Sequence, residues 1–376
     1  MIPRIVKTVK LGFLDQVGRG RVETSASSRA KCAICSRKEP VPMLKIAILD
    51  DYAKIALQCA DWSVLDGKAE ITVFDRHLAL EEAVVALQPF DVLCTVRERM
   101  SMPRSLFERL PKLKLVTIIG MSLPNLDMAA ATEHGVIVAH PNFVNLVASN
   151  IASATPELTW GLMIATVRHI SLESRRMREG AWQNTVGVNL AGRTLGLLGL
   201  GRIGQRMAEY GRAFGMPVIA WSQNLTDDAA RAVGATRVEK DDLFRLADVV
   251  SIHVRLSDRT RGLVTARELA LMKPAAYLIN TSRGPIVVEA DLIAVLRAER
   301  IAGAGIDVYD DEPPAPDHPF RTMNNVTVTP HLGYVTRETL TAFYVDTVEA
   351  VVAFADGAPI RIANPEALAH PRQRRS

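Results

Sequence analysis

Short apolar runs alternate with amphipathic stretches along most of the chain, and this alternation begins at Met43. Five runs in the first part are typical of buried strands, and they cover residues 45–50, 70–75, 91–96, 113–119 and 135–140. Residues 80–87 and 102–110 show the helical spacing of apolar positions, with Ser101 as a cap and Pro103 in a first turn. The pattern predicts an open α/β sheet that ends near His140.

A long helical pattern follows from about Thr155 to residue 177, with Pro156 in its first turn. Further apolar runs predict strands at residues 193–199, 217–222, 247–254, 275–282, 302–309 and 325–332, with helices at 202–215, 265–272 and 289–300. One more helical pattern runs from residue 337 to Gly357, where glycine favours a helix end. We expect this last helix to return to the first sheet.

A β-α-β unit in the second part surrounds Gly199-Leu-Gly201-Arg-Ile-Gly204, which is the G-x-G-x-x-G pattern of a dinucleotide-binding turn. The first glycine allows the tight turn, the second lets the backbone approach a pyrophosphate, and the third permits close packing of helix on strand. The amides of Arg202 and Ile203 at the helix start would face the phosphates. The unit therefore predicts an NAD(P) site.

The second strand of this unit ends at Ser222, where such units normally carry an acidic residue that holds the adenosine ribose. Serine can hydrogen-bond a ribose hydroxyl, but it does not repel a 2′-phosphate. Gln223 beside it adds no positive charge. We therefore expect NAD as the cofactor, with NADP not excluded and accepted within roughly tenfold.

The predicted fold class is α/β, with two Rossmann-like open parallel-sheet domains. The NAD(P)-binding domain, residues 141–330, is inserted into a discontinuous substrate-binding (catalytic) domain made of residues 43–140 and 331–366. Residues 1–42 are rich in Arg, Lys and Ser without a strand or helix period, and we predict an unstructured extension there. Residues 367–376 form a basic tail.

Three polar residues follow predicted strands of the second sheet: Arg283, Glu312 and His331. The carboxyl ends of strands are where open α/β sheets bind ligands. Separately, each residue has a plain structural explanation, as a turn residue, a solvated loop acid and a hydrogen-bonded histidine. Together they offer a carboxylate clamp, an acid that favours a charged histidine, and a general acid/base. This combination indicates hydride transfer to a 2-oxo acid.

Four motifs, "GLGRIG", "INTSRGPIVVE", "GAGIDVYDDEP" and "TPHLG", resemble those of the D-isomer-specific 2-hydroxyacid dehydrogenase family. The resemblance covers about Met43 to Pro365, and the family includes D-3-phosphoglycerate dehydrogenases and glyoxylate/hydroxypyruvate reductases. It implies that Arg283 binds the substrate carboxylate and that His331 is the acid/base held by Glu312.

The resemblance also implies further contacts. Asp307 would bind the nicotinamide carboxamide. Arg97 and Arg99 would meet the substrate, as would Met121 and Ser122 through a loop that presents backbone amides. The expected enzyme is a cytoplasmic homodimer that acts on a small 2-oxo or 2-hydroxy acid. An alternative from another class is an NAD(H)-sensing, corepressor-like interaction protein of the same fold. The chain ends soon after the return helix, so we expect no feedback control by an amino acid.

Composition narrows the function classes. The formal net charge of +4 belongs to the two ends of the chain, since basic residues outnumber acidic ones before Pro42 and three arginines follow Pro371. The body between is net acidic, so nucleic acid is not an expected partner. Four scattered cysteines fit a reducing compartment, and no apolar run approaches the ~18 residues of a membrane span. Cys32 and Cys35 form a lone C-x-x-C without a second pair, which favours a plain polar arm over a zinc or redox site, so no metal site is expected.

Overall fold

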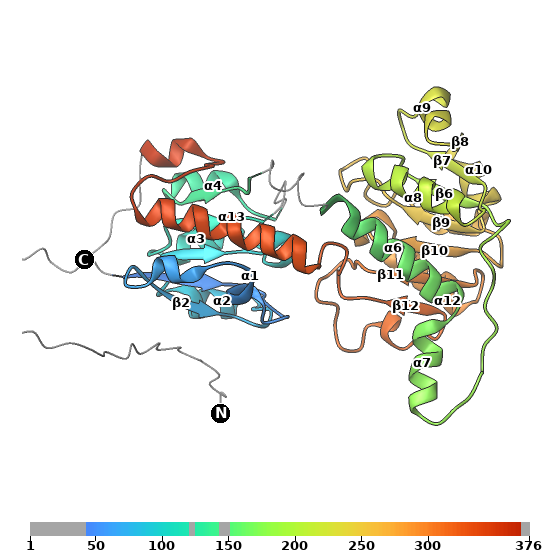
Figure 1. The fold of residues 1–376 in the computed structure, drawn as a ribbon, viewed down its shortest axis with the longest axis horizontal. Helices are drawn as coiled ribbons and strands as arrows, with labels where there is room; N and C mark the ends of the chain where they lie inside the picture. Colours follow the sequence, from blue (N-terminus) through green and yellow to red (C-terminus); the bar gives the residue numbers. More distant parts are fainter. Residues whose placement is uncertain (1–42, 120–124, 143–150, 370–376) are drawn as a thin grey trace, which may run out of the picture. The chain divides into compact units, whose positions relative to one another are not determined.

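The computed structural model describes residues 43–119, 125–142 and 151–369. They divide into two compact units (Figure 1). The first contains the residues up to Pro141 and those from Val345 onward, and the second is Asn142–Tyr344. The second unit keeps His331, which the sequence pattern assigns to the returning segment. The reason is that the amides of Leu332 and Gly333 donate to the side chain of Asp307 within the same unit.

The first unit is built on a sheet of five parallel strands. Their order is β2 (Ala69–Val73), β1 (Leu44–Ile48), β3 (Val92–Cys94), β4 (Leu115–Thr117) and β5 (Ile137–Ala139). Apolar side chains of α2 (Leu80–Leu87), α3 (Arg104–Arg109) and α4 (Met128–Glu133) pack into one buried core with this sheet. Shorter elements complete the unit, namely α1 (Ala56–Cys59), η1 (Trp62–Leu65), η2 (Arg97–Arg99) and η5 (Pro365–Ala369).

The second unit is built on a sheet of seven parallel strands. Their order is β12 (Val326–Val328), β11 (Gly303–Ile306), β10 (Tyr277–Asn280), β9 (Val249–Ile252), β6 (Leu195–Leu198), β7 (Val218–Trp221) and β8 (Thr236–Arg237). The remaining elements are α6 (Ile151–Val167), α7 (Ile170–Arg178), α8 (Arg202–Ala213), α9 (Asp227–Ala232), α10 (Lys240–Leu246), α11 (Ala266–Leu271), η3 (Gly284–Ile286), α12 (Glu289–Arg297) and η4 (Pro319–Arg321). The boundary between the two units falls within the return helix α13 (Arg337–Ala355), between Tyr344 and Val345.

Both faces of the seven-stranded sheet are buried, and β6 shows why its sequence is apolar without alternation. Leu195 and Leu197 face a core formed with α6 and α8. Leu198 faces a second core formed with α10, α11 and α12. At Gly196 a side chain would collide with Ala247 after α10. The two α/β sheets confirm the predicted fold class.

The helical pattern predicted from about Thr155 to residue 177 is not one helix. The structure has α6 and α7 instead, separated at His169, whose backbone is left-handed with φ 53°. The amide of Val188 bonds to the carbonyl of Val167, so a later segment occupies the end of α6. Pro156 lies inside α6 rather than in a first turn, because the helix already includes Ile151.

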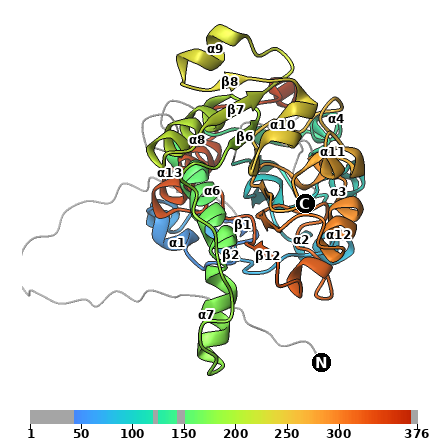
Figure 2. The same ribbon diagram turned by 90° about the vertical axis from the view of Figure 1, so that its right-hand side faces the viewer.

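Helix α7 extends away from the sheet of its own unit in both views (Figure 2).

In the part of the chain that the structure describes, no helix combines the length and the apolar character needed to cross a membrane. The predicted extension, residues 1–42, lies outside the described residues, as do residues 370–376 of the basic tail.

Candidate functional site

The three predicted catalytic residues lie on loops that follow neighbouring strands. Arg283 comes after β10, Glu312 after β11 and His331 after β12, and these strands are adjacent and parallel. In register, Asn280 pairs with Ile306, and Ile306 pairs with Val328. The three loops therefore leave the same edge of one sheet, which is the edge where open parallel sheets bind ligands.

His331 and Glu312 are in direct contact. The Nδ1 atom of His331 lies 2.5 Å from Oε2 of Glu312, and the other carboxylate oxygen accepts the amide of Tyr309 at 3.0 Å. Because Nδ1 is engaged by the carboxylate, Nε2 is the ring nitrogen left for exchange with a substrate. The edge of the Tyr334 ring packs against the imidazole, with centroids 5.6 Å apart. These contacts hold the imidazole in one orientation, which acid/base chemistry at Nε2 would need.

Asp307 holds the loop that carries His331. Its side chain is completely buried, and its Oδ1 accepts from the Thr329 hydroxyl at 2.6 Å and the Leu332 amide at 2.7 Å. Its Oδ2 accepts the Gly333 amide at 3.0 Å, and its carbonyl oxygen accepts the His331 amide at 2.9 Å. Burial raises the pKa of Asp307, an effect that these hydrogen bonds oppose.

These bonds fix the unusual backbone of His331, whose φ is 53°. A left-handed conformation at a histidine persists only when its surroundings impose it. The sequence motif implies that Asp307 holds the nicotinamide carboxamide, whereas the contacts described here are to the His331 loop. Asp307 is therefore a positioning residue for His331, and its contact with nicotinamide stays a prediction.

Asp307→Asn should destabilise the protein by about 1–3 kcal/mol, because the amide group would turn a donor toward the backbone donors of the His331 loop. Urea unfolding of the variant and wild type measures this difference. Asp317→Asn is the matched control, since Asp317 is an exposed aspartate in the segment before η4. Equal loss in both variants would show that the buried contacts of Asp307 are unimportant.

The Arg283 loop is fixed from both sides. The side-chain amide of Asn280 donates to the Arg283 carbonyl at 3.1 Å, and the Ser282 hydroxyl donates to the carbonyl of Val254 at 2.6 Å. At Gly284, a Cβ would lie 2.1 Å from the backbone of Tyr309, so only glycine fits there. This close approach joins the loop after β10 to the loop after β11, and it fixes the backbone position from which the Arg283 side chain extends.

A side-chain hydrogen bond that the sequence does not reveal joins the same two loops. Nε2 of His318 lies 2.9 Å from Oε1 of Glu289, the first residue of α12. The other oxygen of Glu289 accepts the Asp310 amide at 3.4 Å. The two residues are 29 positions apart, and no local spacing rule connects them. The pair ties the start of α12 to the segment that carries Glu312.

The glycine turn has the shape that a dinucleotide needs. Gly199 has φ 109°, and a Cβ there would lie 2.7 Å from the backbone of His253. At Gly204 a Cβ would lie 2.1 Å from the Gly199 carbonyl, so helix α8 packs directly on the turn. By contrast, no described atom lies within 4 Å of a Cβ built at Gly201. The open side at Gly201 suits a pyrophosphate, as do the amides at the start of α8, because the first N–H groups of a helix have no partner within that helix.

Ser222 has a partner within the turn. Its hydroxyl oxygen accepts the amide of Leu200 at 2.9 Å, between the first two glycines of the motif. The sequence suggests a hydroxyl directed at the ribose, whereas the structure shows that it also fixes the turn to the end of β7. An acidic residue here would have to take over this bond, so the contact with ribose stays a prediction.

The predicted substrate residues of the first unit are described only in part. Arg97 and Arg99 form the ends of η2 after β3, and Nη1 of Arg99 donates to the Asp50 carbonyl at 2.7 Å. The guanidinium of Arg99 also lies over the Tyr52 ring, 4.9 Å from its centroid. Met121 and Ser122 lie outside the described residues. The arginines therefore lie at the carboxyl edge of the five-stranded sheet.

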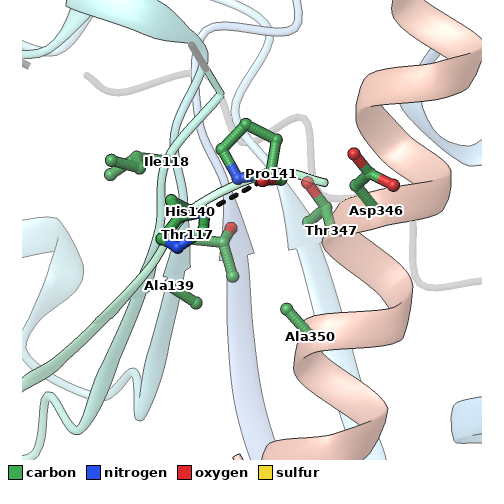
Figure 3. Close-up of a pocket in the computed structure, with 8 residues that line it drawn as sticks. All are labelled: Thr117, Ile118, Ala139, His140, Pro141, Asp346, Thr347 and Ala350. Atoms are coloured by element: carbon green, nitrogen blue, oxygen red, sulfur yellow. Dashed lines mark hydrogen bonds between the residues drawn. The ribbon is translucent and has the colours of Figure 1, made fainter. Parts of the chain in front are cut away.

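A shallow hollow in the first unit, with no enclosed room for a water molecule, lies between the ends of β4 and β5 and helix α13 (Figure 3). The imidazole of His140 is bonded to the Pro141 carbonyl at 2.9 Å. The residues that line this hollow are Thr117, Ile118, Ala139, His140, Pro141, Asp346, Thr347 and Ala350. None of the predicted site residues is among them.

Comparison with known proteins agrees with this geometry. The family model for "D-isomer specific 2-hydroxyacid dehydrogenase, NAD binding domain" matches residues 160–333. The chain is 37% identical over 273 residues to a glyoxylate reductase from Aeropyrum pernix, covering 70% of this chain and 80% of that relative. The chain belongs to the D-isomer-specific 2-hydroxyacid dehydrogenase family.

Other dehydrogenases are also similar to this chain. A D-3-phosphoglycerate dehydrogenase from Methanocaldococcus jannaschii is 35% identical over 300 residues, which cover 79% of this chain and 54% of that relative. The chain thus spans about half the length of that dehydrogenase. A solved phosphoglycerate oxidoreductase from Vibrio cholerae O395 is 35% identical with a TM-score of 0.76, covering 84% of this chain and 100% of that chain.

The family membership predicted from the four motifs is confirmed, and with it the enzyme class. The protein is an oxidoreductase that acts on the CH–OH group of its donor and uses NAD(P). The glycine turn of the second unit, with its open side at Gly201, is where this cofactor would bind.

Proposed function

We propose that the protein reversibly reduces a small 2-oxo acid to the D-2-hydroxy acid, with His331 as the acid/base. The observation that carries this proposal is the 2.5 Å contact between His331 and Glu312, on the loops beside Arg283. A carboxylate-bound imidazole and a guanidinium on loops that leave the same edge of one sheet would provide proton exchange and carboxylate binding for one substrate.

In the proposed reaction, Arg283 binds the substrate carboxylate, and its positive charge polarises the adjoining carbonyl. When bound at the glycine turn, a reduced nicotinamide cofactor would provide the hydride for the carbonyl carbon. His331 donates the Nε2 proton to the carbonyl oxygen, and Glu312 stabilises the charged imidazole from Nδ1. In the oxidation direction His331 accepts the same proton. Asp307 keeps His331 in place through the bonds to its loop.

We further propose NAD as the preferred cofactor, with weak discrimination against NADP, because neither Ser222 nor Gln223 supplies the positive charge that a 2′-phosphate would need. Glyoxylate, hydroxypyruvate and phosphohydroxypyruvate are the first substrates to test, since the relatives are named for glyoxylate, hydroxypyruvate and phosphoglycerate. Arg97 and Arg99 are proposed to contact the acid from the first unit, as are Met121 and Ser122.

A spectrophotometric screen tests the function. Purified protein is mixed with NADH or NADPH and with glyoxylate, hydroxypyruvate, pyruvate or phosphohydroxypyruvate, and the loss of absorbance at about 340 nm is followed. Turnover of at least one acid is expected. If the protein binds NADH but reduces none of them, the interaction-protein alternative gains support and the proposed reaction is wrong for these acids.

We also propose a homodimer formed through the second unit. Four apolar side chains of α7 and the segment after it are at least half exposed, namely Ile170, Met177, Trp182 and Val186. Exposed apolar clusters of this kind mark interfaces. Trp182→Glu should shift the mass measured by light scattering from a dimer toward a monomer. Val85→Glu is the control, since Val85 is 73% exposed on α2 of the first unit; an equal shift there, or a monomeric wild type, would contradict the proposal.

A further inference from the structure

Arg237 lies beside the turn that follows Ser222, although it is distant from Ser222 in sequence. It belongs to β8, the edge strand that pairs with β7, and Ala220 is its partner in register. Its Nε donates to the carbonyl of Leu225 at 3.0 Å. The amide of Leu225 in turn bonds to the carbonyl of Ser222 at 3.1 Å, which closes the turn. A cation is thus fixed to the turn that begins at the expected ribose position.

Two carboxylates engage this guanidinium. Nη2 of Arg237 lies 2.8 Å from Oε1 of Glu239, and Nη1 lies 3.9 Å from Oδ1 of Asp227. The arginine side chain is 34% exposed, and the acids are 68% and 69% exposed. All three groups are therefore open to a ligand from solvent. Together they carry one positive and two negative formal charges, which disfavours an additional phosphate.

The turn itself offers no competing cation. Gln223 and Asn224 are exposed and uncharged, and Arg231 on α9 is paired with Asp228. A 2′-phosphate on the adenosine ribose would need a guanidinium near the end of β7. Arginine is suited to this because its planar group binds phosphate at two points. Arg237 carries the guanidinium that a 2′-phosphate would need, but Glu239 and Asp227 already engage it.

We propose that Arg237 decides between NAD and NADP, and that Asp227 and Glu239 hold it in the NAD-preferring state. This proposal rests on cofactor binding at the glycine turn, and it names residues other than Ser222 as the source of discrimination. When the acids are neutralised, the guanidinium becomes a partner for the 2′-phosphate of NADP. The weak discrimination expected at Ser222 is then set by the balance of charges around Arg237.

The test measures binding of NADH and NADPH to the full-length protein by titration calorimetry, without any oxo acid. Glu239→Gln and Asp227→Asn should each raise the affinity for NADPH relative to NADH by about two- to fivefold, as expected for partly exposed charges. The double variant should gain roughly tenfold, and the gain should shrink at high salt. Adenosine 2′,5′-bisphosphate and adenosine 5′-monophosphate should reproduce the difference as isolated probes.

Adding Arg237→Gln to the double variant should abolish the gain, because glutamine can still donate to the Leu225 carbonyl but carries no charge. Arg237→Lys should retain part of it. Asp228→Asn is the matched control, since it removes the same charge from the next residue of α9, where the partner is Arg231. A gain that survives Arg237→Gln, or that Asp228→Asn reproduces, would overturn the proposal. If the wild-type protein binds neither NADH nor NADPH, the proposed cofactor site itself is wrong.

Discussion

His331→Gln should lower turnover by roughly 10²–10⁴-fold, while the affinity for NADH changes little. Glutamine can accept a bond and fill part of the space, but it cannot exchange a proton near neutral pH. The glycine turn follows β6 and the His331 loop follows β12, and four sheet steps separate these strands, so the nucleotide turn should be unaffected. Steady-state kinetics gives the rate, and calorimetry with NADH gives the affinity.

His169→Gln provides the matched control for this variant. His169 has the same left-handed backbone, with φ 53° at both histidines, but it lies between α6 and α7. A loss caused by backbone strain alone would appear in both variants. Glu312→Gln should give an intermediate loss, since it keeps an acceptor near Nδ1 but not the charge. Wild-type turnover in His331→Gln would remove this histidine from the mechanism.

Arg283→Lys should lower kcat/KM for the oxo acid by on the order of 10²–10³, with most of the loss in KM. A lysine keeps the positive charge, but a single ammonium cannot bind both carboxylate oxygens in one plane. Kinetics at saturating NADH measures the effect. Arg245→Lys is the control, because Arg245 forms an exposed ion pair with Asp242 on α10. An unchanged KM in Arg283→Lys would show that the substrate carboxylate binds elsewhere.

Much of the fold follows from the sequence alone. The apolar runs predict all five strands of the first sheet and six strands of the second, and each predicted range overlaps a strand of the structure, although β1 and β2 begin one residue earlier than predicted. Strand β8 is missed because it has only two residues, Thr236 and Arg237, and no apolar run. The break at His169 is missed because the apolar period continues across it, while the contact of Val188 with the end of α6 comes from a later segment.

The site divides in the same way. The glycine turn and the positions of Arg283, Glu312 and His331 after strands are local features, because a short motif specifies a turn and a strand end. The roles of Asp307, Glu289 and Arg237 depend on residues 20 or more positions away or on a neighbouring strand. The spacing of apolar residues predicts whether a segment is a helix or a strand. It does not predict the order of the strands in a sheet, so it cannot tell which loops lie together. The strand order placed β8 beside β7 and β12 beside β11, and only that order brought Arg237 to the cofactor turn and Asp307 to His331.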